Sequence, residues 1–230
     1  MTISKEKAVT TAIKEGKVYK EKLSNTIILI IYRDRVDNIL KHLEIEFRPH
    51  NYQHLTGLLL SHRDSKTGEL IVREHTAMEF YRRCTDIPYI TPDEIVFNDE
   101  GTIDLKMAAL PYITQITRIT RMTGSYDNRT KIKLSADYIV GGVNSCIGVS
   151  KNSDNDRYYP CSCLSENIMN ITKYTSQVLT IFQKEISSKD VYKDIKYVAK
   201  GLNLNKLIFP EYIREMISLE NYMAESGTPR

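Results

Sequence analysis

Groups capable of acid–base chemistry are concentrated in one short stretch, residues 48–57. It holds two histidines, a hydroxyl group, an arginine and a glycine: His50, His54, Thr56, Arg48 and Gly57. Histidine suits proton transfer because its unperturbed pKa lies near neutrality. The stretch follows an alternating segment, residues 43–47, and precedes an apolar run, residues 58–60. Functional groups are often placed where a strand ends, so we interpret this stretch as a candidate site.

The spacing of His50 and His54 leaves a second chemistry open. Histidines four residues apart share one face of a helix and can then bind zinc, which would allow a zinc-dependent hydrolase. The alternation before the stretch, together with Pro49 and Asn51, argues against a helix here. We therefore predict no metal site and no cofactor.

Two later stretches are also rich in polar and aromatic groups, residues 133–138 (KLSADY) and 158–164 (YYPCSCL). The second contains two of the four cysteines, Cys161 and Cys163; the others are Cys84 and Cys146. Zinc would need two more ligands at a suitable spacing, and the sequence has no such pair nearby. Thiols are among the most often buried side chains, so we expect packed cysteines rather than disulfides or a metal centre.

Composition limits the class of protein. The chain has 230 residues, a hydrophobic fraction of 41% and a net charge of only +3, so any site for a polyanion must be a local patch. Its longest apolar runs are far shorter than the roughly 20 residues of a membrane span. The first residues lack the apolar core of a signal peptide. We expect a cytoplasmic protein with no membrane partner.

The first half of the chain predicts helices around one β-hairpin. Residues 5–23 have helical spacing that Gly16 is expected to break into two short helices. Residues 26–47 predict a hairpin with a polar turn at 33–38. Residues 77–84 predict a short helix, 88–101 a connector, and 103–119 a helix with an apolar stripe that Pro111 kinks or begins.

The second half predicts an antiparallel meander. We expect strands at residues 132–140, 145–150, 157–164, 177–184 and 194–199, with Pro160 tolerated only at an edge or bulge. Residues 206–224 predict one amphipathic helix, followed by a loose tail. The predicted class is α+β, with a single domain at 1–205 and a C-terminal helical appendage and tail at 206–230.

The three stretches, in this order, resemble a phage- and prophage-associated group of nucleases in the barnase–EndoU–colicin–RelE-like (BECR) superfamily. The resemblance rests on residues 51–57 (NYQHLTG), 133–138 and 158–164 and extends over about residues 24–200. It implies a BECR-like α+β fold and metal-independent cleavage of RNA. In that reaction a base takes the proton of a ribose 2′-OH, the oxygen attacks phosphorus, and an acid protonates the leaving oxygen.

The resemblance also implies roles for particular residues. His54 is the best candidate for acid–base catalysis, and Thr56 and Ser162 supply hydroxyl groups that orient the phosphate or the nucleophile. Phosphate-binding charge would come from Arg48, Lys133 and Arg157, because charge builds up on the phosphoryl oxygens. Tyr138 and Tyr159 would stack on bases of single-stranded RNA.

Each of these residues also has a purely structural interpretation. His54 can be a hydrogen-bonded turn residue, and residues 56–57 a turn or helix cap. Ser162 and Lys133 can be ordinary strand residues, Asp137 can pair with a neighbouring arginine, and the tyrosines can border the core. A second catalytic histidine is not apparent unless His42, His62 or His75 folds inward.

Two hypotheses of different class therefore remain besides the zinc enzyme. One is an endoribonuclease, acting as a toxin or phage effector, with RNA as substrate and an antitoxin as a possible partner. The other is a protein of the same fold without catalysis, which binds RNA or inhibits a host defence protein. The first requires His54, Ser162 and a cation to lie close together.

Overall fold

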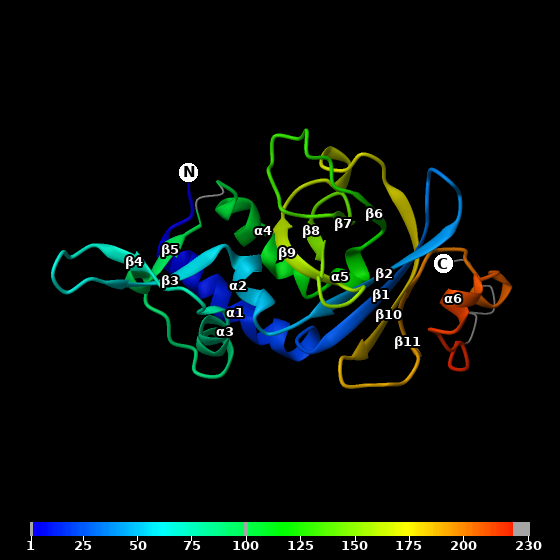
Figure 1. Cartoon of the computed structure of the whole chain (residues 1–230), viewed down its shortest axis with the longest axis horizontal. Helices are drawn as coiled ribbons and strands as arrows, with labels where there is room; N and C mark the ends of the chain where they lie inside the picture. Colours follow the sequence, from blue (N-terminus) through cyan, green and yellow to red (C-terminus); the bar gives the residue numbers. More distant parts are fainter. Residues whose placement is uncertain (1, 99–100, 223–230) are drawn as a thin grey trace.

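The computed structural model describes residues 2–98 and 101–222. Its main feature is an eight-stranded sheet with the order β1-β2-β9-β8-β7-β6-β10-β11 (Figure 1). β10 also pairs with β1, so the sheet closes into a barrel and β11 extends it on the outside. All pairs are antiparallel except β2–β9. The strands are β1 (Thr26–Arg33), β2 (Leu40–Phe47), β6 (Met122–Ser125), β7 (Tyr138–Gly141), β8 (Cys146–Lys151), β9 (Tyr158–Leu164), β10 (Ser176–Glu185) and β11 (Asp194–Val198).

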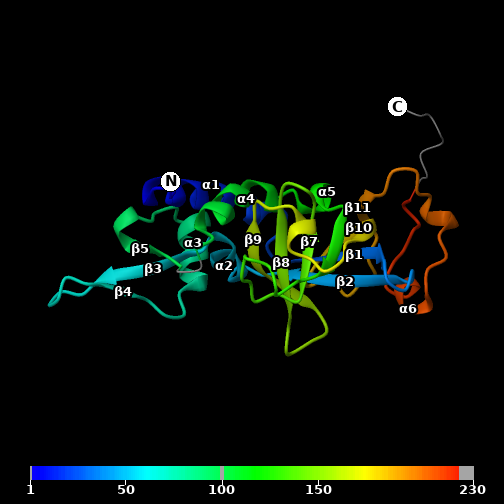
Figure 2. The same cartoon turned by 90° about the horizontal axis from the view of Figure 1, so that it is seen from above.

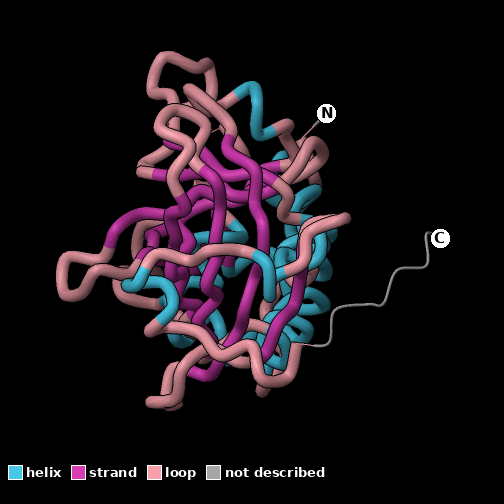
Figure 3. The backbone as a smooth tube through the Cα atoms, turned by 90° about the vertical axis from the view of Figure 1, so that its right-hand side faces the viewer, coloured by secondary structure: helices cyan, strands magenta, loops and turns pink. Residues whose placement is uncertain are grey.

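Helices and a second, small sheet complete the α+β class that the sequence predicts. The α-helices are α1 (Lys5–Lys22), α2 (Asn51–Thr56), α3 (Ala77–Thr85), α4 (Ile103–Ile113), α5 (Ile116–Ile119) and α6 (Glu211–Arg214). The small sheet has the order β4-β3-β5, with β3 at Leu58–Arg63, β4 at Leu70–Val72 and β5 at Ile95–Phe97. Figure 2 shows α1, α4 and α5 along one side of the barrel, and Figure 3 shows most helices on that side of the strands. None of the helices in the described part of the chain has the length and apolar character needed to cross a bilayer.

β1 separates two hydrophobic cores. Ile28 and Ile30 belong to the core that the barrel shares with α1 and α4, whereas Ile27, Leu29 and Ile31 pack against the C-terminal segment. Successive side chains of a strand point to opposite faces, so a strand covered on both faces must be apolar at every position. This arrangement explains the unbroken apolar run of residues 27–31, and the expected hairpin of β1 and β2 is confirmed.

The expected break at Gly16 is wrong, because α1 is continuous through it. A Cβ at Gly16 would lie 2.9 Å from Cys84 Cβ and 3.2 Å from a ring carbon of Tyr52. Glycine is needed here so that α1 can approach α2 and α3 closely, and the packing outweighs its poor helix propensity.

Pro111 lies inside α4 without ending it, and the break in the predicted helix 103–119 falls at residues 114–115 instead. The strand expected at 132–140 is reduced to β7, and β6 was not expected at all. The strands expected at 145–150, 157–164, 177–184 and 194–199 are confirmed as β8, β9, β10 and β11. Hence the meander is present, and its closure onto the hairpin is the new feature.

The long helix expected at 206–224 is wrong over its described part. Only Glu211–Arg214 is α-helical, after a 3-10 turn at Leu204–Lys206. Leu204, Phe209 and Ile213 are buried against the outer face of β1, so sheet contacts rather than helical periodicity set the path of this segment. Residues 223–230, with the expected tail, lie outside the described residues, and the domain division at 205–206 stays a prediction.

Candidate active site

The stretch that contains His54 is helical, contrary to the expectation from Pro49 and Asn51. His50 is the N-cap residue of α2, and Gly57 ends the helix in the left-handed region at φ 69°. The Asn51 side chain accepts a hydrogen bond from the Arg48 amide at 2.8 Å, and buried Tyr52 donates to the Ala12 carbonyl of α1 at 2.6 Å. The local bond at the start of α2 and the long-range bond to α1 together stabilise a helix that local propensity does not favour.

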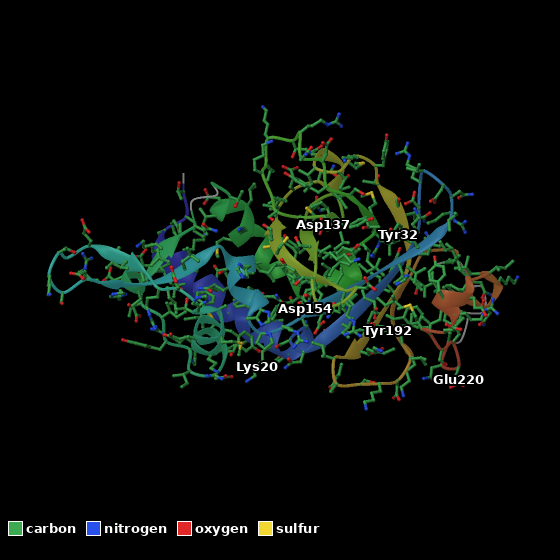
Figure 4. All side chains as sticks on the ribbon, viewed as in Figure 1. Lys20, Tyr32, Asp137, Asp154, Tyr192 and Glu220 are labelled. Atoms are coloured by element: carbon green, nitrogen blue, oxygen red, sulfur yellow. The ribbon has the colours of Figure 1, made fainter. Side chains whose placement is uncertain are left out.

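The helix places His50 and His54 one turn apart on the wall of the same cavity, of about 570 Å³. The guanidinium-bearing side chain of Arg48 lines this cavity as well. Residues of the β8–β9 loop also line this cavity. The remaining lining residues are Glu46, Asn51, Asn152, Asp154, Asn155 and Tyr159 (Asp154 is labelled in Figure 4).

A second hollow, of about 220 Å³, adjoins the first and shares His54 and Tyr159 with it. Leu134, Ser135, Cys161 and Ser162 line the rest of this hollow. His54 therefore lies on the wall common to a larger polar cavity and a smaller one.

Ser162 reaches the second hollow because of a β-bulge. Gly148 pairs with Ser162 and Val149 pairs with Pro160, which leaves Cys161 as an extra residue in β9. Adjacent residues of a regular strand face opposite sides, and a bulge breaks this alternation. Both Cys161 and Ser162 thus line one hollow, and the expected location of Pro160 at an edge or bulge is confirmed.

The Ser162 hydroxyl is buried and has no hydrogen-bond partner within the described residues. A buried hydroxyl without a partner is costly, and native proteins keep few of them. Ser162 lines a hollow next to His54, and its hydroxyl oxygen is itself shielded from solvent.

Two carboxylates of β2 hold the arginines of this region. The buried Glu46 carboxylate forms an ion pair with Arg48, and its other oxygen lies 3.8 Å from Arg157 Nη1. Arg157 Nε lies 3.7 Å from Glu44, which also accepts a hydrogen bond of 2.5 Å from Tyr192 (labelled in Figure 4). Arg157 is thus joined to the cavity through Glu46 and is not among the residues that line it.

The pKa of His50 is lowered below its usual value, first because the imidazole is partly buried and secondly because the Arg48 guanidinium is nearby. Glu46 opposes this shift. The neutral form of His50 is therefore favoured at pH 7. A neutral imidazole carries an unprotonated nitrogen that can accept a proton.

Three of the predicted site residues lie elsewhere. The buried Thr56 hydroxyl donates to the Gln53 carbonyl and accepts from the Leu58 amide, so it completes the end of α2. Lys133 is exposed and donates to the Asn128 carbonyl at 2.9 Å. The Tyr138 ring packs edge-on against Tyr158, with centroids 5.5 Å apart. Arg48, His54, Tyr159 and Ser162 thus line one or both of the two hollows, whereas these three residues and Arg157 line neither.

The described residues form no metal-binding cluster, and their cysteine thiols are harder to ionise than usual. No group of three or more His, Cys, Asp or Glu side chains within them is arranged to hold a metal ion. All four cysteines are free, and burial raises the pKa of each thiol. Cys163 donates to the Leu55 carbonyl at 3.1 Å, which ties β9 to α2. Cys84, Cys146 and Cys163 are packed thiols, as expected, whereas Cys161 is half-buried and lines the smaller hollow.

Sequence reasoning overlooked His50, which we considered only as a zinc ligand. Its spacing to His54 contained the signal, but the signal required α2 to be helical. It also overlooked Glu46 and the β8–β9 loop, whose proximity to α2 follows from the parallel pairing of Ile45 in β2 with Tyr158 in β9.

A protein-family model matches most of the chain. The family model described as phage-Barnase-EndoU-ColicinE5/D-RelE like nuclease4 matches residues 14–200. This range includes both hollows, the barrel strands and α2. No curated protein and no solved structure matches this chain.

Proposed function

We propose that this chain, which belongs to the phage-Barnase-EndoU-ColicinE5/D-RelE like nuclease4 family, cleaves RNA without a metal ion through attack of a ribose 2′-OH on the adjacent phosphorus. Membership of the family supports a nuclease-like function. RNA as the substrate and the metal-independent route are our inference from the side chains in the two hollows.

The observation that carries the proposal is the location of His54 where the two hollows meet. A phosphodiester bound at that wall would extend one nucleotide into each hollow. His50 and His54 would then act as the acid–base pair, with His50 as the base because its lowered pKa keeps it neutral. His54 would protonate the leaving 5′-oxygen.

The other lining groups have roles that match the charge and shape of RNA. Arg48 would stabilise the negative charge that builds up on the phosphoryl oxygens. Tyr159, present in both hollows, would stack on a base. The Ser162 hydroxyl would bond to the sugar or phosphate in the smaller hollow.

The test is cleavage of end-labelled single-stranded RNA by purified protein, with and without EDTA. We expect cleavage that EDTA does not prevent, products ending in a 2′,3′-cyclic phosphate, and no cleavage at a 2′-deoxy position, because the nucleophile is then missing. His54→Ala should abolish cleavage, whereas His75→Ala, at an exposed histidine, should not. Equal rates for wild type and His54→Ala would refute the proposal.

One observation favours a second candidate, a non-catalytic binding protein such as an inhibitor of a host defence system. Arg48 is already engaged by Glu46, and Asp154 adds negative charge to the same cavity. Both carboxylates weaken the attraction for a phosphate. Under this alternative, the wild-type protein would bind RNA or a host protein, and no cleavage would be detected under any condition. A role as toxin or phage effector, with an antitoxin partner, would follow only from the first proposal, in which the protein cleaves RNA.

A further inference from the structure

β4 is an edge strand at the tip of the molecule. The β3–β4 hairpin projects from one end of the folded molecule in both Figure 1 and Figure 2. In the described part of the structure β4 pairs with β3 alone. Its three residues, Leu70, Ile71 and Val72, are 38%, 43% and 44% exposed.

The hydrogen bonds at both ends of the hairpin fix which backbone groups of β4 face outward. The Arg73 amide donates to the Leu60 carbonyl, and the Asp64 amide donates to the Glu69 carbonyl. Hydrogen-bonded pairs recur at every second residue of an antiparallel ladder, so Ile71 bonds to β3 as Glu69 and Arg73 do. The N–H and C=O groups of Leu70 and Val72 therefore point to the open edge.

This edge lacks most of the features by which proteins usually block such pairing. Exposed edges are generally protected by short length, charged side chains, proline, a bulge or a covering element. β4 is short and lies between Glu69 and Arg73, but its three residues are apolar in succession, with no proline and no bulge. An edge of this kind is suited to the addition of another strand.

The residues around Ile71 are complementary to a second copy of themselves. In an antiparallel pair centred on Ile71, Glu69 of one copy lies opposite Arg73 of the other, and Leu70 lies opposite Val72. The guanidinium of Arg73 also binds Glu79 of its own chain, so Glu69 would add a second carboxylate to it. With Ile71 at the centre, Leu70 of one copy forms backbone hydrogen bonds with Val72 of the other. This agrees with the outward direction of the N–H and C=O groups of both residues. Charge, apolar contact and hydrogen bonding thus agree on one register.

We propose that two copies of this chain associate through β4, antiparallel and centred on Ile71. Four backbone hydrogen bonds join the copies, two for each pair of Leu70 with Val72. The two small sheets become one continuous sheet with the order β5-β3-β4-β4-β3-β5. The contact is narrow, so the dimer is a weak, reversible one. The site around His54 lies outside this contact and is present in each copy.

Cysteine crosslinking tests the register. Non-hydrogen-bonded antiparallel residues have Cα atoms about 4.5 Å apart, which a disulfide can span. Ile71→Cys should therefore give a disulfide-linked dimer under mild oxidation. Leu70→Cys is the matched control, because the two copies of residue 70 are diagonal neighbours about 7–8 Å apart and should crosslink far more slowly. Crosslinking of Leu70→Cys at the same rate as Ile71→Cys would overturn the proposed register.

Sedimentation of the full chain tests the association. Val72→Pro removes an outward donor while leaving the bonds to β3, and Glu69→Arg puts two arginines opposite each other. Each should raise the dimer dissociation constant at least about tenfold. Thermal unfolding of each variant establishes that it is folded. A wild type that is monomeric up to about 1 mM, or that takes up an extended peptide at β4 in place of a second copy, would overturn the proposal.

Discussion

The buried carboxylate of Glu46 is paired with the guanidinium of Arg48 on the wall of the cavity that His50 and His54 also line. If Arg48 binds phosphate as we propose, its charge is thus partly neutralised before any ligand binds. The pair would then affect the strength of phosphate binding, and both of its members also affect the pKa of His50.

Glu46→Gln should strengthen RNA binding. The substitution keeps the shape of the side chain and removes one negative charge beside Arg48, so the dissociation constant should fall roughly threefold to tenfold at low salt. Fluorescence anisotropy with a short labelled RNA measures it. Glu79→Gln, which removes a carboxylate paired with Arg73 far from the cavity, is the control and should leave binding unchanged. Weaker binding by Glu46→Gln would contradict the assignment of Arg48.

The pH profile should carry the signature of His50. A base must be unprotonated, and burial together with Arg48 lowers the pKa of His50 below its usual value. On its acidic side, kcat/KM should therefore fall only as pH drops below that lowered pKa. In Arg48→Ala the neighbouring positive charge is gone, so the acidic limb should move to higher pH. An unmoved limb would mean that another group is the base.

Ser162→Ala should separate function from folding. The buried Ser162 hydroxyl has no partner within the described chain, so its removal should stabilise the fold by about 1 kcal/mol while raising KM. Ser61→Ala is a matched control, because the Ser61 hydroxyl is likewise buried without a partner there but lines neither hollow. It should stabilise the fold to a similar extent with unchanged KM. Thermal unfolding and steady-state kinetics provide the two measurements, and equal KM values for both variants would exclude a ligand contact by Ser162.

Gly57→Ala should disrupt the candidate site through α2. At φ 69° an alanine is strained by about 1–2 kcal/mol, and its Cβ would lie 2.9 Å from Lys106 Cδ. Gly68→Ala has the same kind of strain at φ 74° with no atom within 4 Å, so it isolates the backbone effect. Gly57→Ala should be the less stable variant in urea denaturation and should lose activity, whereas Gly68→Ala should keep it. Equal stabilities would show that Lys106 moves aside freely.

Local sequence patterns were sufficient to predict the parts of the fold that depend on residues close together in the chain. The hairpin of β1 and β2 and the strands β8, β9 and β10 follow from apolar runs, alternation and turn residues within about ten positions. The order of three short motifs also pointed to the nuclease family that the comparison supports. These features depend on residue types that are adjacent in the chain.

Contacts between distant residues decided the rest. α2 is helical because Tyr52 bonds to Ala12 and packs near Gly16 of α1, and only this helix brings His50 beside His54. The closure of the barrel through β1 and β10 depends on pairing partners far away in the chain, and the bulge in β9 that places Ser162 in the hollow lined by His54 depends on the pairing with β8. Sequence alone thus determined which chemical groups are available and in which strands most of them lie. Tertiary packing decided which of them share a cavity, because its contacts outweigh local propensities of less than about 1 kcal/mol per residue.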